Sequence, residues 1–271
     1  MTFLSSRRAA GGTARATLLG VPYDATASFR RGSRFGPGAI RDASQSIETY
    51  SPRLDRDLDD LAFTDGGDID VDGLDTAALG AAIERASPPG LPFLLGGEHT
   101  NTLGAVRAAA RAHSDLTVVQ WDAHTDLRDD YEGARVCHAT VMRRILDDGR
   151  PLVQLGIRAG TKAEFELARR RSLHCAQDVA WPPDLLDTVR GRPLYLTVDI
   201  DVLDPGEAPG TGNPEPDGAS YAALVDSLRS LAGARIAGMD LVEVAPALDH
   251  SGRTPIVAAS LVREMLLLFA A

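Results

Sequence analysis

The 271-residue sequence has little lysine and little cysteine, and each shortage excludes a class of chemistry. Its single lysine, Lys162, leaves one residue for Schiff-base catalysis and excludes a G-K-[ST] phosphate-binding loop. Cys137 and Cys175 form no C-x-x-C pair, so neither a disulfide scaffold nor a thiolate zinc site is indicated. The sequence also has no G-x-S-x-G nucleophile elbow and no G-x-G-x-x-G dinucleotide turn.

The sequence predicts no signal peptide and no membrane-spanning segment, and it has no excess of basic residues. Met1–Gly20 contains arginines but no apolar core, and the longest apolar stretch, Ile256–Ala271, is too short to span a bilayer. Lys+Arg 28 against Asp+Glu 38 gives a net charge of −10, which argues against a nucleic-acid partner and permits a cationic substrate. We therefore expect a cytoplasmic protein with no membrane or nucleic-acid partner.

Short apolar runs alternate with helical patterns along the chain, and no Pro/Ser linker divides it. The predicted strands are Ala16–Tyr23, Pro92–Leu95, Leu116–Asp122, Leu152–Ile157, Pro193–Val198 and Arg235–Leu241. The predicted helices are Pro37–Glu48, Asp75–Ala86, Thr100–Ala112, Ala139–Leu146, Lys162–Arg171, Ser220–Leu231 and Thr254–Phe269. This alternation predicts a single α/β domain over residues 1–271, with three αβα layers around one mostly parallel sheet.

Polar clusters follow several of the predicted strands, where an open parallel sheet places its site. Four of them are Gly96-Gly97-Glu98-His99, Asp122-Ala123-His124-Thr125-Asp126, Asp199-Ile200-Asp201 and the single residue Glu243; a fifth, His138, lies in the following loop. In extended chain, residues i, i+2 and i+4 point to one face, so the acidic clusters should converge.

Crowded carboxylates repel one another unless a cation lies among them. Oxygen and imidazole ligands without thiolate suit Mn²⁺, and less specifically Zn²⁺ or Fe²⁺. Together with His99, the clusters offer four aspartates and two histidines, which is more than one ion usually takes. Bridging carboxylates hold two ions roughly 3.5–4 Å apart in hydrolases that activate a shared water. The sequence therefore predicts a binuclear metal hydrolase.

These motifs resemble the ureohydrolases, the arginase and agmatinase family of Mn²⁺-dependent amidinohydrolases. The resemblance covers most of the chain and is closest to the agmatinase branch. It is carried by the metal motifs above and by Gly20-Val21-Pro22-Tyr23-Asp24, Gly32-Ser33-Arg34-Phe35-Gly36-Pro37 with Ile40-Arg41, Asp65-Gly66-Gly67-Asp68, Pro209-Gly210-Thr211-Gly212, and Asp240-Leu241-Val242-Glu243-Val244-Ala245-Pro246 with Asp249.

The resemblance implies a cofactor of two Mn²⁺ per subunit and a role for each site residue. One ion would be held by His99, Asp122, Asp126 and Asp199, and the other by His124, Asp122, Asp199 and Asp201, so that Asp122 and Asp199 bridge. Water activated between the ions would attack the guanidinium carbon, giving urea and an amine. Glu243 would pair with the guanidinium, and His138 would carry a proton to the leaving amine. The resemblance also implies a homotrimer or homohexamer.

Several alternatives stay open at this point. The substrate implied first is agmatine, giving putrescine, or N1-aminopropylagmatine, giving spermidine. The acidic loop residues Asp129, Asp130 and Glu132 would steer a polycation or simply face solvent. A carboxylate-bearing substrate (arginine, guanidinobutyrate or formiminoglutamate) would instead use Arg128 or Arg135. A metal-dependent deacetylase fits the motifs less well, and a catalytically silent metal-binding family member is the remaining alternative.

Overall fold

The structure is a computed structural model that describes residues 1–6, 14–86, 88 and 90–270. Residues 7–13 of the Met1–Gly20 stretch and Ala271 of the last apolar stretch lie outside the described residues. Within the described part of the chain, no helix is long and apolar enough to cross a membrane.

Eight parallel strands form the central sheet of the described chain, in the order β4-β1-β5-β10-β9-β6-β7-β8. Their bounds are β1 Ala16–Val21, β4 Phe63–Asp68, β5 Leu91–Gly96, β6 Thr117–Trp121, β7 Leu152–Leu155, β8 His174–Ala176, β9 Leu194–Asp199 and β10 Ile236–Val242. A separate antiparallel pair joins β2 Tyr50–Ser51 to β3 Arg56–Asp57.

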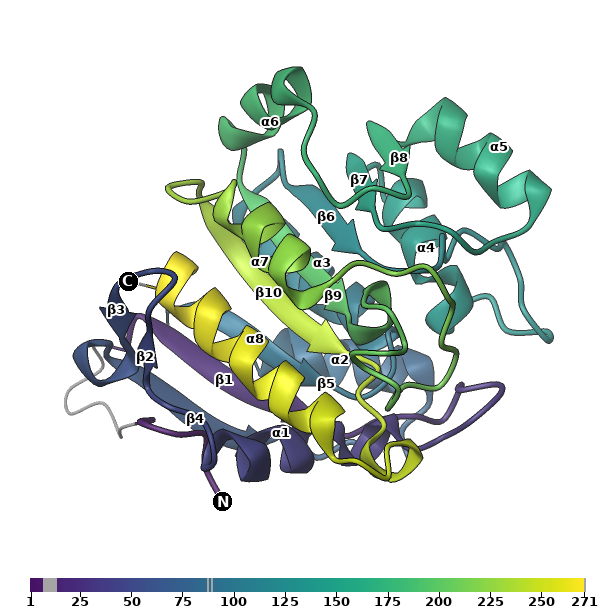
Figure 1. The fold of residues 1–271 in the computed structure, drawn as a ribbon. Helices are drawn as coiled ribbons and strands as arrows, with labels where there is room; N and C mark the ends of the chain where they lie inside the picture. The colour runs from purple at the N-terminus through teal and green to yellow at the C-terminus, as the bar shows by residue number, and fades with distance from the viewer. Residues whose placement is uncertain (7–13, 87, 89, 271) are drawn as a thin grey trace.

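Helices cover both faces of this sheet (Figure 1). One face packs against α1 Gly36–Ser44, α6 Pro183–Arg190, α7 Tyr221–Arg229 and α8 Arg253–Phe269. The other face packs against α2 Thr76–Arg85, α3 Asn101–Ala112, α4 Val141–Asp147 and α5 Lys162–Arg171. Each face has its own buried apolar cluster, so the predicted three-layer αβα architecture is confirmed.

All of the predicted strands and helices form, most of them with ends shifted by a few residues. The sequence analysis missed β4, β8, α6 and the short β2–β3 pair. The sequence of β4, Phe-Thr-Asp-Gly-Gly-Asp, is poor in the β-branched and aromatic residues that mark strands. Tertiary contacts decide its conformation instead: Arg41 of α1 is buried and donates from Nε and Nη2 to the two carboxylate oxygens of Asp65, at 2.8 and 3.0 Å.

This buried ion pair generates a prediction about stability. Arg41→Met leaves the Asp65 carboxylate buried without its partner, which costs about 3–5 kcal/mol of unfolding free energy. The control is Arg53→Met, because the Arg53–Asp226 pair is largely exposed and such pairs contribute about 0–1 kcal/mol. Urea-induced unfolding of both variants measures the difference. Equal midpoints for the two variants would contradict the role assigned to Arg41.

Candidate metal centre

The predicted site residues lie at the carboxyl edge of the four central strands. His99 is in the loop after β5, Asp122 directly follows β6, Asp199 ends β9 and Glu243 directly follows β10. Since β5, β10, β9 and β6 are neighbours in that order, residues far apart in sequence meet at one place. This is the edge where parallel sheets carry their sites.

The backbone is tightly packed where these loops meet. A Cβ at Gly97 would lie 2.0 Å from the carbonyl oxygen of Tyr23, so only glycine fits there. The backbone N–H of Glu243 donates to the carbonyl of Gly97 at 2.8 Å. Glu243 and Asp126 have φ of 64° and 52°, a conformation that costs energy in residues with a Cβ and that clusters at functional sites.

Six predicted ligands come together at this edge, although not through the alternation of an extended strand. Asp201 lies in a 3-10 turn after β9, at Ile200–Val202, and Asp126 has a left-handed backbone. Loop geometry therefore produces a convergence that the sequence analysis attributed to strand alternation. Ligand atoms lie within 4.8 Å of one another in two sets, His99 with Asp122 and Asp199, and His124 with Asp122 and Asp201. Asp126 completes the group, its Oδ2 lying 3.1 Å from Nδ1 of His99.

Burial and like charge dominate the electrostatics of this cluster. Burial, followed by repulsion from Asp201 and Asp122, raises the pKa of Asp199 well above its usual value. The same two effects, burial and repulsion from Asp122, raise the pKa of Asp126 to about 7. Although burial opposes the charged imidazole, Asp201 and Asp122 raise the pKa of His124 to about 12. The cluster therefore favours positive charge at its centre.

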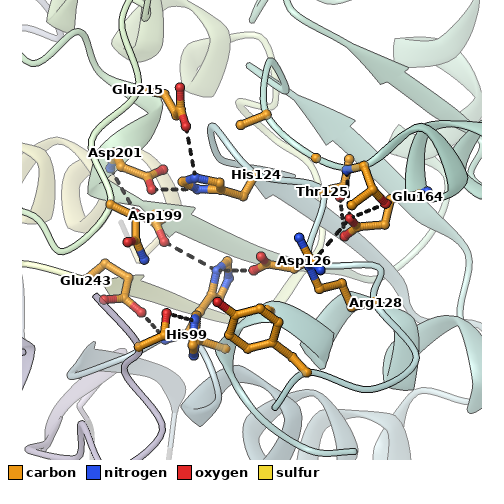
Figure 2. A pocket seen from close by; sticks show the side chains of 18 of the residues that line it. His99, His124, Thr125, Asp126, Arg128, Glu164, Asp199, Asp201, Glu215 and Glu243 are labelled. Atoms are coloured by element: carbon orange, nitrogen blue, oxygen red, sulfur yellow. Dashed lines mark hydrogen bonds and ion pairs between the residues drawn. The ribbon is translucent and has the colours of Figure 1, made fainter. Parts of the chain in front are cut away.

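The donor atoms fit divalent cations. Nδ1 of His99 is buried and lies 3.0, 3.1 and 3.5 Å from carboxylate oxygens of Asp122, Asp126 and Asp199. Within the described chain it nevertheless makes no hydrogen bond of acceptable geometry. Nδ1 of His124 similarly lies 2.9 Å from Oδ2 of Asp201, and Figure 2 shows both rings directed into the group of carboxylates. Carboxylate oxygen and imidazole nitrogen are ligands that Mn²⁺ and related ions accept.

Glu243 and His138 line the same cavity, whose volume is about 340 Å³. The Oε1 of Glu243 accepts the backbone N–H of His99 at 2.8 Å, and burial raises the pKa of Glu243 to about 8. His138 is held between two hydroxyls, with Nδ1 3.4 Å from Thr26 Oγ1 and Nε2 3.3 Å from Ser28 Oγ. Burial lowers the pKa of His138 to about 4, so its imidazole is neutral at pH 7.

The sequence analysis assigned no role to Glu98, Thr26 or Ser28. Glu98 is completely buried, accepts the backbone N–H of Thr26 at 2.9 Å and also accepts its hydroxyl. The same Thr26 hydroxyl accepts the backbone N–H of His138 at 3.3 Å. Glu98 therefore anchors the loop that contacts His138. An acidic residue between a glycine pair and a histidine was the available signal.

Of the charged residues in the loop after Asp126, Arg128 lines the cavity, whereas Arg135 and Asp129 do not. Arg128 lines the cavity, with Nε 3.7 Å from Glu164 and its guanidinium over the ring of Tyr131. Arg135 does not line the cavity; it is largely exposed and lies 3.4 Å from Asp129. Asp129 also pairs with Arg144. Its charge is thus neutralised locally, which favours a structural role over substrate steering.

Comparisons with known proteins agree with this geometry. The chain matches the Arginase family over residues 14–268. It is 43% identical over 264 residues to an agmatinase from Bacillus cereus, covering 93% of this chain and 91% of that protein. It is 40% identical over 244 residues to an N(1)-aminopropylagmatine ureohydrolase from Thermococcus kodakarensis, covering 86% of this chain and 83% of that protein.

The fold is also found among solved structures. The crystal structure of agmatine ureohydrolase of Thermoplasma volcanium has a TM-score of 0.87 with this chain at 31% sequence identity, covering 98% of this chain and 93% of that one. The motifs, the fold and the position of the ligand cluster lead to one assignment. The chain belongs to the arginase family, as an agmatinase-like ureohydrolase.

Proposed function

We propose that the chain is a single-domain, binuclear Mn²⁺-dependent amidinohydrolase that releases urea from a guanidino substrate. The observation that carries this proposal is the presence of two metal-ligand sets that share the buried Asp122, and whose other members line one cavity with Glu243 and His138. Divalent cations held there would lower the pKa of a water molecule to about 7, making a nucleophile available near neutrality. Oxygen and imidazole donors support Mn²⁺ as the native ion.

Glu243 is suited to hold the guanidinium. Its Oε1 is fixed by the backbone of His99, and the side chain lines the cavity beside the ligands. A planar cation next to this carboxylate would offset the effect of burial and stabilise the ionised form. Glu243 would thereby orient the guanidinium carbon toward the attacking water.

His138 is suited to move the proton. Because its imidazole is neutral at pH 7, it can accept a proton released during attack and pass it to the leaving amine. Burial places the pKa of this imidazole well below its usual value. Cleavage of the C–N bond then yields urea and a protonated amine.

Agmatine or N1-aminopropylagmatine is the substrate that we propose. The names of the Bacillus cereus and Thermococcus kodakarensis relatives support this pair. The partly exposed carboxylate of Glu215 at the cavity, 3.9 Å from His124 Nε2, is compatible with a substrate that carries a second cationic group. A carboxylate-bearing substrate remains the competing proposal, because Arg128 also lines the cavity. The expected homotrimer or homohexamer and the cytoplasmic location stay predictions.

The first prediction from this proposed function concerns the substrate. Purified chain loaded with Mn²⁺ should release urea from agmatine or N1-aminopropylagmatine faster than from guanidinobutyrate or arginine, because neither proposed substrate carries a carboxylate. Colorimetric urea assays with the four compounds side by side measure this. Preference for guanidinobutyrate or arginine would transfer the assignment to the competing proposal, and Arg128→Met should then raise KM for that substrate.

The second prediction concerns the bridging carboxylates. Asp199→Asn removes a charge that serves both proposed ions, so bound metal and urea release should fall together. Metal content after desalting and urea release are the two measurements. The matched control is Asp184→Asn, because Asp184 is exposed in the first turn of α6. Two ions retained by the Asp199→Asn protein would show that this carboxylate does not bridge.

The third prediction concerns proton transfer. His138→Ala should lower kcat by about 10²–10⁴-fold, as for other positioned acid–base groups, while two metal ions stay bound. His174→Ala in β8 is the control, because His174 does not line the cavity. Steady-state kinetics and metal analysis test both variants. An unchanged kcat in His138→Ala would assign proton transfer to another group.

A further inference from the structure

A row of four buried polar side chains crosses the sheet directly beneath the ligand cluster. Asp240 of β10 is in register with Thr197 of β9, Thr197 with Gln120 of β6, and Gln120 with Gln154 of β7. All four are completely buried. Residues in register on parallel strands point to the same face, here the face covered by α2–α5. We call these four residues the polar row.

The burial of four polar side chains requires a physical explanation, because burying a polar group costs free energy unless the group is hydrogen-bonded. The neighbouring strand residues on the opposite face, such as Leu196 and Leu241, belong to an apolar cluster. Within the row, Gln154 Nε2 donates to Gln120 Oε1 at 2.8 Å. The strands therefore bury polar side chains at the row and apolar side chains at the neighbouring positions on the opposite face.

The polar row contacts the ligand cluster at two points. The first follows from strand geometry, since Asp122 is two residues beyond Gln120 and side chains two apart point to the same face. The amide Nε2 of Gln120 donates to Oδ2 of Asp122 at 2.7 Å. The hydroxyl of Thr197 lies 2.9 Å from Nε2 of His99, which is the ring nitrogen opposite the carboxylates. One member of the row thus contacts the shared carboxylate and another contacts a histidine.

The direction of the hydrogen bonds follows from donor counting. If Nδ1 of His99 offers a lone pair to a cation, Nε2 carries the hydrogen and donates to Thr197 Oγ1. The Thr197 hydroxyl must then donate elsewhere, and Thr102 Oγ1 lies 3.4 Å from it, with the carboxylate of Asp240 as its register neighbour. Asp240 Oδ2 already accepts the hydroxyls of Tyr195, at 2.7 Å, and Thr102, at 2.9 Å. Thr102 thus links Thr197 to Asp240, whose carboxylate is the acceptor at this end of the row.

We propose that the polar row positions the ligands of the metal centre: Thr197 backed by Asp240 fixes the tautomer and orientation of His99, and Gln120 backed by Gln154 fixes Asp122. None of the four residues needs to touch an ion or the substrate. They act through the ligands, as second partners of metal-bound histidines and carboxylates do. This inference rests on the metal centre of the proposed function.

The test compares three threonine variants. Thr197→Val removes the hydroxyl that contacts His99, whereas Thr197→Ser keeps it. Thr117→Val is the matched control, because Thr117 is equally buried at the opposite end of β6 and its hydroxyl has no hydrogen-bond partner in the described residues. The measurements are the affinity for Mn²⁺ and Co²⁺ by chelator competition, the visible absorption spectrum of bound Co²⁺, and thermal unfolding of the metal-free proteins.

Thr197→Val should weaken binding of one ion by about 10–100-fold and change the Co²⁺ spectrum, as loss of such partners does elsewhere. Thr197→Ser and Thr117→Val should stay within about threefold of the unsubstituted protein. A second variant, Gln120→Met, should weaken binding through Asp122 and decides the question if Thr197→Val does not fold.

Three results would overturn the inference: unchanged affinity and spectrum in Thr197→Val and Gln120→Met, equal losses in Thr197→Val and Thr197→Ser, or an equal loss in Thr117→Val. Urea release by the unsubstituted protein is measured separately. Two bound ions without urea from any guanidine would contradict the proposed function, and the relative affinities of the variants would still decide the role of the polar row.

Discussion

Repulsion between buried carboxylates is the constraint on which the rest of this structure depends. Asp122, Asp126, Asp199 and Asp201 lie at one sheet edge with almost no exposure to water, so their negative charges are poorly screened. Four such groups stay ionised together only when positive charge lies among them. The two imidazoles, the closely packed loops and the polar row are arranged around that requirement, and it is what makes the edge a candidate metal site.

The two faces of the sheet meet different demands. The face covered by α1, α6, α7 and α8 buries a large cluster of aliphatic and aromatic side chains, which stabilises the fold through removal of apolar surface from water. The face covered by α2–α5 contains the polar row as well as an apolar cluster. Stability and ligand positioning are thus divided between the two sides of the same strands. Positive φ at Asp126 and Glu243 is a further local cost at the functional edge.

Two side chains that line the cavity are suited to different tasks, substrate binding and proton transfer. A half-buried carboxylate, Glu243, faces the position where a guanidinium would bind, while a neutral imidazole, His138, lies beside it between two hydroxyls. The pKa of Glu243 is raised and that of His138 is lowered. Environments that shift two pKa values in opposite directions allow one group to bind substrate and the other to transfer a proton. Arg128 and Glu215 both line the cavity and carry opposite charges, which is why the two proposed substrate classes differ in the group that they would place there.

The sequence by itself determined the fold class, most of the strands and helices, and which residues are candidate metal ligands, because apolar runs and the polar clusters after them are local patterns. It did not reveal β4, whose glycines and aspartates look like a loop until Arg41 pairs with Asp65. It also gave no role to Thr197 and Gln120, although each is a polar residue inside an apolar run, two positions before a predicted ligand. Only the tertiary structure decided their roles, because strand register and loop closure set which side chains meet, and both depend on contacts between residues far apart in the chain.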